Sequence, residues 1–329
     1  MSEARTFGLT RRATLAVLAS SVAAPAALAQ SSGGRPIRII VGFGPGSAND
    51  LIARELARYM AESLGQPVIV ENRPGAGGSV GTEAVVKAAP DGLTIGLGTS
   101  SQMVMNVALY RNLPFDVERD LRQIGLVGRT PLVLAGRASG AKTLKELIAN
   151  ARANPGQVTY GSAGTGSISH IVGEAFARAA DVKLNHVPYK GNGPAMADLA
   201  GGHVDLVFDG IITSQPMAQQ GRVRLLAFGG KQRSPVIPDV PTFAESGLRD
   251  YDAYSWNCLF APAGTTDADV ARLNQALNAA LALPAMKDRL ARGGSENLGP
   301  STPAQADAFG RKERERWVPF VRSLKLDIN

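Results

Sequence analysis

Two glycine-rich segments have the residue types and the spacing of anion-binding loops. The first covers residues 42–50 (GFGPGSAND) and the second covers residues 160–170 (YGSAGTGSISH). Each lies between a predicted strand and a predicted helix. Glycines let the main chain approach a ligand closely, and the unpaired amides at a helix start attract negative charge. We therefore expect both segments to hold an anionic group.

The first segment carries side chains suited to the start of its helix. Ser47 and Asp50 have the spacing of a capping box, in which the hydroxyl accepts from a backbone amide and the carboxylate reaches back. Ala48, in the same turn, is a further expected ligand contact. Phe43 would form an apolar wall of the cleft, and simple core packing is its alternative role.

The second segment adds hydroxyl donors at Ser162, Thr165 and Ser167, beside the glycines Gly164 and Gly166. Charge-assisted hydrogen bonds contribute roughly 1.5 to 3 kcal/mol each. Three or four of them across the two segments would support micromolar binding, which requires about 8 kcal/mol. The alternative is that both are ordinary turns that need glycine for geometry. Two of them, each at the carboxyl end of a strand where open α/β sheets bind ligands, favour binding.

Four further polar residues are candidates for the same cleft. Ser100 and Ser101 follow a predicted strand and are expected to line the cleft edge. His170 would either lie beside the ligand or cap and pack at its helix. Asp209 ends a strand, where it would accept from an amino group, a hydroxyl or a bridging water of the ligand; a solvated or capping role is the alternative.

Several kinds of chemistry are not supported by the sequence. There is no GxxxxGK[ST] motif and no GxGxxG in register, so we expect no nucleotide cofactor. The three histidines (His170, His186 and His203) are far apart and Cys258 is the only cysteine, so we expect no metal site. We interpret His186 and His203 as structural. No G-x-S-x-G elbow is present, so we expect no catalytic residues and no enzyme, with a periplasmic hydrolase as a weaker alternative.

Strands alternate with helices along the chain, which predicts parallel pairing with helices on the sheet faces. The predicted strands cover residues 36–41, 67–71, 93–97, 132–135, 158–160, 185–188, 204–208, 223–229 and 255–261. The predicted helices cover residues 51–64, 79–88, 142–153, 168–180, 194–201, 267–281, 284–293 and 302–320.

The strand series restarts near Leu132, which indicates two α/β units. We expect the strand there and the strand at 255–261 to be the two crossings between lobes. The predicted fold is therefore α/β and two-lobed, each lobe a Rossmann-like, mostly parallel sheet flanked by helices. Lobe I is expected to comprise residues 30–132 and 256–329, and lobe II residues 133–255.

Residues 1–29 have the pattern of an export signal. Arg5, Arg11 and Arg12 precede an uncharged apolar run, and residues 27–29 (ALA) form a small-x-small cleavage site. Sec and Tat export both remain open. We expect a periplasmic protein. The formal net charge of +7 suits an anionic ligand, and the basic residues are too scattered for a nucleic-acid partner.

At these residues the chain resembles the solute receptors of tripartite tricarboxylate transporters, the Bug family. The matching segments are PIRIIV (36–41), LGQPVIVENRPGAGG (64–78), APDG (89–92), NLPF (112–115), HVPYKG (186–191), PDVPT (238–242) and APAGT (261–265). One departure concerns the first loop, where Gly42 and Ser47 replace a proline and a glycine typical of the family.

The resemblance implies a type II periplasmic-binding-protein fold with a two-strand hinge. It implies that the two loops grip a ligand carboxylate, partly through ordered waters, and that the receptor delivers the ligand to a membrane permease of two subunits. We expect a monomer that binds a small mono- or dicarboxylate. A ligand sensor for a signalling partner is the alternative that the sequence leaves open.

Overall fold

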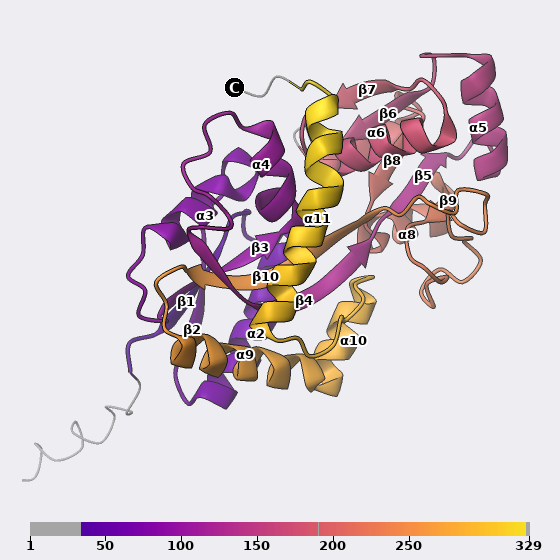
Figure 1. Ribbon diagram of the computed structural model, residues 1–329. Helices are drawn as coiled ribbons and strands as arrows, with labels where there is room; N and C mark the ends of the chain where they lie inside the picture. Colours follow the sequence, from indigo (N-terminus) through magenta and orange to yellow (C-terminus); the bar gives the residue numbers. More distant parts are fainter. Residues whose placement is uncertain (1–33, 190, 327–329) are drawn as a thin grey trace, which may run out of the picture.

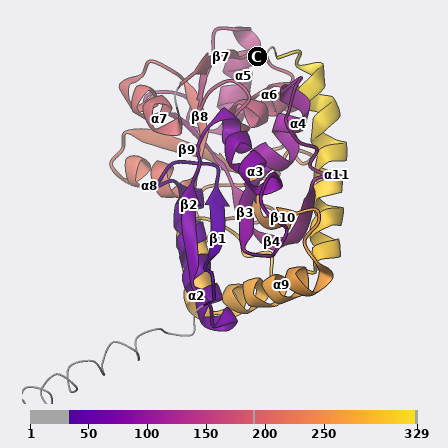
Figure 2. The same ribbon diagram turned by 90° about the vertical axis from the view of Figure 1, so that its left-hand side faces the viewer.

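The computed structural model describes residues 34–189 and 191–326, so the predicted export signal at 1–29 lies outside the described residues. Two five-stranded sheets, each with helices on its faces, form two lobes (Figures 1 and 2). In the described part of the chain, no helix is both long and apolar enough to span a bilayer.

The first sheet has the strand order β2-β1-β3-β10-β4. Its strands are β1 (Ile37–Val41), β2 (Val68–Asn72), β3 (Thr94–Thr99), β4 (Leu121–Pro131) and β10 (Tyr254–Pro262). Its helices are α2 (Ala48–Leu64), η1 (Ala76–Gly78), α3 (Ser79–Val86), the π-helix η2 (Ser101–Met105), α4 (Asn106–Leu109), α9 (Asp267–Ala282), α10 (Pro284–Arg292) and α11 (Pro303–Ser323).

The second sheet has the order β7-β6-β8-β5-β9. Its strands are β5 (Val133–Arg137), β6 (Thr159–Ser162), β7 (Asn185–Pro188), β8 (Leu206–Asp209) and β9 (Val223–Phe228). Its helices are α5 (Leu144–Ala153), α6 (Ile168–Ala180), α7 (Asn192–Gly201) and α8 (Ile211–Gln219).

The predicted α/β fold class is confirmed, and both sheets are mixed. β1 pairs in parallel with β2 and β3, and β6 pairs in parallel with β7 and β8. The strands next to the crossings run against their neighbours: β10 is antiparallel to β3 and β4, and β5 is antiparallel to β8 and β9. The antiparallel pairs arise because the chain passes between the sheets in both directions.

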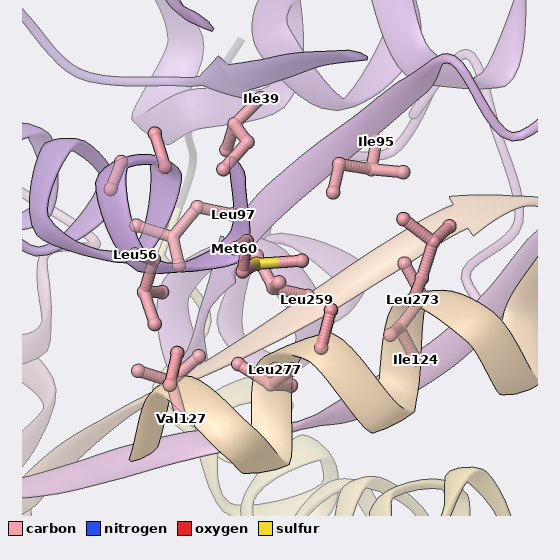
Figure 3. Close-up of a cluster of buried hydrophobic side chains, with 14 of the residues drawn as sticks. Ile39, Leu56, Met60, Ile95, Leu97, Ile124, Val127, Leu259, Leu273 and Leu277 are labelled. Carbon is pink, nitrogen blue, oxygen red and sulfur yellow. The ribbon is translucent and has the colours of Figure 1, made fainter. Parts of the chain in front are cut away.

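A core of aliphatic side chains holds the first sheet against α2 and α9 (Figure 3). In α2 the buried residues Ala53, Leu56, Ala57 and Met60 recur at helical spacing and form one apolar face. This face packs with sheet residues such as Leu97. The helix ends at a glycine in the left-handed conformation. Because α2 packs firmly on the sheet, it supports the loop that precedes it.

The chain crosses between the sheets at Leu132 and again near Ala253. The amide of Leu132 donates to the carbonyl of Ala253 at 2.7 Å, so the two crossings lie side by side. The amide of Gly229, at the end of β9, donates to the carbonyl of Leu132 at 2.8 Å. The predicted pair of crossing strands therefore matches the observed path. The lobe boundaries predicted at 132/133 and 255/256 stay a prediction.

The carboxyl ends of the parallel strands in both sheets point toward these crossings. At the end of β3, Thr99 is in register with Asn257, which is in turn in register with Gly128 of β4. At the end of β8, Asp209 is in register with Val133 of β5. Gly128 and Val133 are separated by at most about 18 Å of extended chain. The two edges where loops leave the parallel strands therefore face each other.

Helix α6 has two apolar faces that contact different parts of the molecule. Val172 and Phe176 belong to a cluster within the second sheet's lobe. Ile171, with Ile168 packed beside it, belongs to a cluster that includes residues of η2, β10 and α11. The long helix α11 runs along both lobes (Figures 1 and 2). Helix α6 thus joins the lobes directly after the second glycine-rich loop.

Candidate anion-binding site

The first glycine-rich loop ends in a tightly capped helix start. The hydroxyl of Ser47 accepts from the amide of Asp50 at 3.2 Å, and Asp50 Oδ2 accepts from the amide of Gly46 at 2.9 Å. The carboxylate therefore reaches back one residue further than in a capping box. The amides of Ala48 and Asn49 have no acceptor within the helix, because they belong to its first turn. These two amides can therefore donate to a group outside the helix.

Asp50 is a buried carboxylate whose acceptor positions are occupied by protein groups. Besides Gly46, it accepts from Arg54 at 3.0 Å and from Asn72 Nδ2 at 2.9 Å. The hydrogen bond from Arg54 contributes most to a pKa of about 2, helped by the amide of Gly46 and by Asn72, while burial opposes it. Asp50 is therefore a fixed negative charge at this helix start, neutralised by Arg54.

The second loop repeats this construction with a histidine in place of the aspartate. The hydroxyl of Ser167 accepts from the amide of His170 at 3.3 Å, and the amide of Gly166 donates to His170 Nδ1 at 3.0 Å. Gly166 and Gly46 share nearly the same backbone angle, with φ of +80° and +79°. The first-turn amides of Ile168 and Ser169 remain available, as in the first loop.

The remaining predicted residues of the second loop differ in exposure. Thr165 is exposed at the loop tip. Ser162 is fully buried, and its Oγ lies 2.7 Å from His186 Nε2 and accepts from the amide of Gly164 at 3.1 Å. Gly164 has φ of +124°, a conformation that favours glycine. The hydroxyl of Ser162 is thus engaged inside the loop.

His170 and His186 stack behind the second loop. Their ring centroids are 3.9 Å apart and the rings are 16° from parallel. Burial and the neighbouring His186 lower the pKa of His170 to about 3, and burial lowers the pKa of His186. Both rings are therefore neutral at pH 7.

The structure places the other predicted residues around the same edges. Phe43 packs against the core of the first sheet, and Ser100 is buried with its Oγ 3.0 Å from Ser255 Oγ. Ser101 begins the π-helix η2. Asp209 is buried and accepts from Asn192 Nδ2 at 2.6 Å; burial raises its pKa.

Three residues near these loops were not predicted as part of the site. Asn49 Oδ1 accepts from Asn257 Nδ2 at 2.9 Å, which links the first loop to β10. Asn192 connects the second loop to β8, because its Oδ1 accepts from Ser169 Oγ at 3.1 Å while its amide group donates to Asp209. His186 was interpreted as structural, although its place on the strand next to β6 brings it to Ser162.

Two sheets with facing carboxyl edges, joined by two crossings and each bearing a capped helix start, define a two-lobed binding protein of the periplasmic type II class. The family model of the tripartite tricarboxylate transporter family receptor matches residues 52–326. The chain belongs to this family, as the sequence resemblance predicted.

Three solved structures are similar to this chain over nearly its whole length. The periplasmic binding protein BugD is 33% identical, with a TM-score of 0.77, covering 89% of this chain and 98% of BugD. MatC from Rhodopseudomonas palustris, solved with bound malate, is 33% identical with a TM-score of 0.77, covering 87% of this chain and 99% of MatC. Rpa4515 of R. palustris, solved with adipate, is 31% identical with a TM-score of 0.80, covering 89% and 99%.

Proposed function

We propose that this protein is a periplasmic receptor that captures a small mono- or dicarboxylate between its two lobes and delivers it to the permease subunits of a tripartite tricarboxylate transporter. The observation that carries the proposal is the pair of helix starts, one on each facing sheet edge, each with two first-turn amides free of helical acceptors. Malate and adipate in MatC and Rpa4515 support a carboxylate as the ligand class.

The expected contacts are main-chain amides and hydroxyls. The amides of Ala48 and Asn49 would bind one side of the carboxylate, and those of Ile168 and Ser169 the other. Thr165, exposed at the tip of the second loop, would donate its hydroxyl. Such neutral donors hold an anion without a charged partner, as helix starts do for phosphate and carboxylate groups. Capture is therefore reversible and involves no covalent step.

The ligand class is tested by calorimetry against a panel of mono-, di- and tricarboxylates that includes malate and adipate. We expect saturable binding in the micromolar range, which corresponds to about 8 kcal/mol. The corresponding amides, which lack the negative charge, serve as control ligands. The ligand should be recovered unchanged after incubation. Equal binding of acid and amide, or appearance of a product, would refute the proposal.

The contact with Thr165 is tested by Thr165→Val, which removes the hydroxyl and keeps the shape. We expect about a tenfold loss of affinity, the effect of one hydrogen bond, with unchanged thermal unfolding. Ser139→Ala is the matched control, because Ser139 is exposed in the turn that follows the far end of β5. If both variants bind equally well, Thr165 is not a ligand contact.

The role in transport is tested in cells that lack this receptor. We expect loss of uptake of the radiolabelled ligand identified by calorimetry, and recovery when the full chain with its leader is restored. Normal uptake combined with a lost transcriptional response to the ligand would favour the sensor role instead. Size-exclusion chromatography with light scattering would test the expected monomer in the same preparation.

A further inference from the structure

Two histidines lie behind the second loop and contact it from different elements. His170 is in the first turn of α6, and its Nδ1 accepts from the amide of Gly166 at 3.0 Å. His186 is on β7, and its Nε2 lies 2.7 Å from Ser162 Oγ. The two rings stack on each other and Tyr160 lies beside them, 5.0 Å from the His186 ring. Each imidazole therefore holds one end of the loop.

The hydrogen bonds determine which nitrogen of each ring carries a proton. A backbone amide can only donate, so Nδ1 of His170 carries no proton and Nε2 carries it. Ser162 Oγ already accepts from the amide of Gly164 at 3.1 Å. We assign its single proton to the nearer acceptor, which is His186 Nε2 at 2.7 Å and not the carbonyl of Gly164 at 3.2 Å. On this assignment His186 is protonated on Nδ1.

We propose that His170 and His186 are positioning residues: as neutral hydrogen-bond acceptors they hold the second loop in its ligand-binding shape, and ligand affinity falls when either ring is protonated. This inference rests on the proposed carboxylate-binding function of the loop. The reason is geometric. A protonated imidazole donates from both nitrogens. At His170 it would direct an N–H at the amide of Gly166, and at His186 it would force the Ser162 hydroxyl to turn its proton to the carbonyl of Gly164.

The same arrangement excludes Ser162 as a direct ligand donor. Its side chain is fully buried and its proton is directed at His186. The amides that we propose as ligand contacts in this loop are those of the later residues Ile168 and Ser169. Ser162 Oγ accepts a hydrogen bond from the amide of Gly164. On this proposal, the hydroxyl that was predicted to contact the ligand instead fixes the shape of the loop.

Few titratable groups face the two rings. On α6, Glu174 Oε1 lies 3.9 Å from His170 Nε2, and on β6 the hydroxyl of Tyr160 donates to the same carboxylate at 2.5 Å. Asp209 on β8 is reached only through Asn192 and Ser169. The other side of α6 presents isoleucines to the first lobe. Among the residues that the structure describes, Glu174 is the acidic group beside the His170 ring, and burial outweighs its effect on the pKa of His170.

The sign of the pH dependence follows from the lowered pKa values. A free histidine has its pKa near 6.5, whereas the pKa of His170 is about 3 and that of His186 is also lowered. The unfolded or loosened loop therefore binds more protons than the folded loop. The contribution of both rings is complete above about pH 6.5. That of His170 decreases as the pH falls toward 3, and that of His186 decreases below pH 6.5.

The test compares substitutions that keep or remove the acceptor. His170→Asn places an amide oxygen where Nδ1 was, and His186→Gln places one where Nε2 was; neither can titrate. His170→Leu and His186→Leu remove the acceptor. His203→Gln is the matched control, because His203 lies before β8 at the edge of the sheet opposite the loop. Affinity for malate and adipate is measured from pH 8 to pH 3, so that the interval reaches the pKa of His170.

We expect the leucine variants to lose about tenfold in affinity at pH 7.5, the effect of one hydrogen bond. The double variant His170→Asn with His186→Gln should bind like the wild type at pH 7.5 and lose less affinity than the wild type as the pH falls toward 3. Protonation of the ligand affects both proteins equally and cancels in this comparison. Wild-type affinity in the leucine variants, or identical pH profiles in wild type and double variant, would overturn the proposal.

A ligand-free measurement separates this inference from the proposed function. Long-range ¹H–¹⁵N NMR of the imidazoles should show His170 protonated on Nε2 and His186 on Nδ1 at pH 7, with His203 as the internal comparison. Any other tautomer, or a charged ring, would overturn the positioning role. If the expected tautomers are found and no carboxylate of the panel binds, the proposed function fails, whereas the role of His170 and His186 in holding the loop remains supported.

Discussion

The two glycine-rich loops begin their helices with the same hydrogen-bonding pattern but differ in the side chain that accepts from the glycine amide. In both, a serine caps the helix and the preceding glycine amide donates to the residue four positions later. That residue is Asp50 in the first loop and His170 in the second. The first helix start thus already holds a carboxylate with a pKa of about 2, whereas the second holds a neutral ring with a pKa of about 3.

The difference between Asp50 and His170 affects folding stability and ligand binding in different ways. A carboxylate at a helix start is stabilising, because it satisfies free amides and interacts with the helix dipole. The same charge repels an anionic ligand, although Arg54 offsets it here. The neutral His170 holds its glycine amide without adding negative charge. We therefore expect the first loop to contribute more to folding and the second loop to contribute more to binding.

The largest expected effect is on stability at the first loop. Asp50→Ala leaves the amide of Gly46, Asn72 and Arg54 without their common acceptor, and we expect a loss of about 3 kcal/mol in the free energy of unfolding at pH 7. Urea denaturation measures this loss. Asp120→Ala is the control, since Asp120 also has a pKa of about 2 but is only partly buried, beside the exposed Arg119. A smaller loss for Asp50 than for Asp120 would contradict the comparison.

The pH dependence of the same variant follows from the lowered pKa of Asp50. Its contribution is complete above the unfolded value of 3.8 and is lost as the pH falls toward 2. The difference in unfolding free energy between wild type and Asp50→Ala should therefore shrink over this interval. A constant difference down to pH 2 would show that the charge of Asp50 does not contribute.

A smaller effect is expected from alanine at the two matched glycines. Gly46→Ala and Gly166→Ala impose the same backbone strain, because both positions have φ near +80°. Each should cost about 1 to 2 kcal/mol of stability. Carboxylate affinity measured by calorimetry should fall further for Gly166→Ala than for Gly46→Ala. Equal losses of affinity would show that both loops contribute equally to ligand binding.

The smallest effect concerns the capping hydroxyls. Ser47→Ala and Ser167→Ala each remove one acceptor from a helix start, and each should cost about 1 kcal/mol of stability. Thermal unfolding of the two variants should shift by similar amounts. A markedly larger shift in the unfolding temperature for either variant would show that the serine stabilises the rest of its loop as well as the helix start.

Most of the fold could be predicted from sequence patterns. The helix at Ile168–Ala180 has the predicted bounds because a serine cap begins it, and the strand at Asn185–Pro188 also has its predicted bounds. Helix α2 begins at Ala48 and not at the predicted residue 51, since Ser47 is its cap. Helix α8 was missed because Pro216 interrupts its pattern.

The long strand β4 was also missed, for a different reason. It contains arginines and glycines and does not alternate between polar and apolar residues. Its conformation depends on β10, a partner more than a hundred residues later, and the pairing contains two irregularities near Cys258. Pairing between distant strands leaves little local signal in either one.

The two loops could be located from their glycines and serines, but the direction of each side chain could not. Ser162 was expected to donate to the ligand, and a spacing rule cannot show that His186 lies against it, because that contact depends on pairing between β6 and β7. In the same way, no sequence motif around Asn192 indicates its hydrogen bonds with Ser169 and Asp209.

The position of β10 between β3 and β4 has a consequence for the order of folding. The second sheet is formed by residues 133–228, a continuous stretch of chain, whereas the first sheet needs a strand that is synthesised only after the second sheet is complete. Until residues 254–262 are present, β4 has no neighbour in its sheet. We expect the second sheet to form first, so that a chain truncated before residue 254 retains one folded unit and lacks a closed cleft.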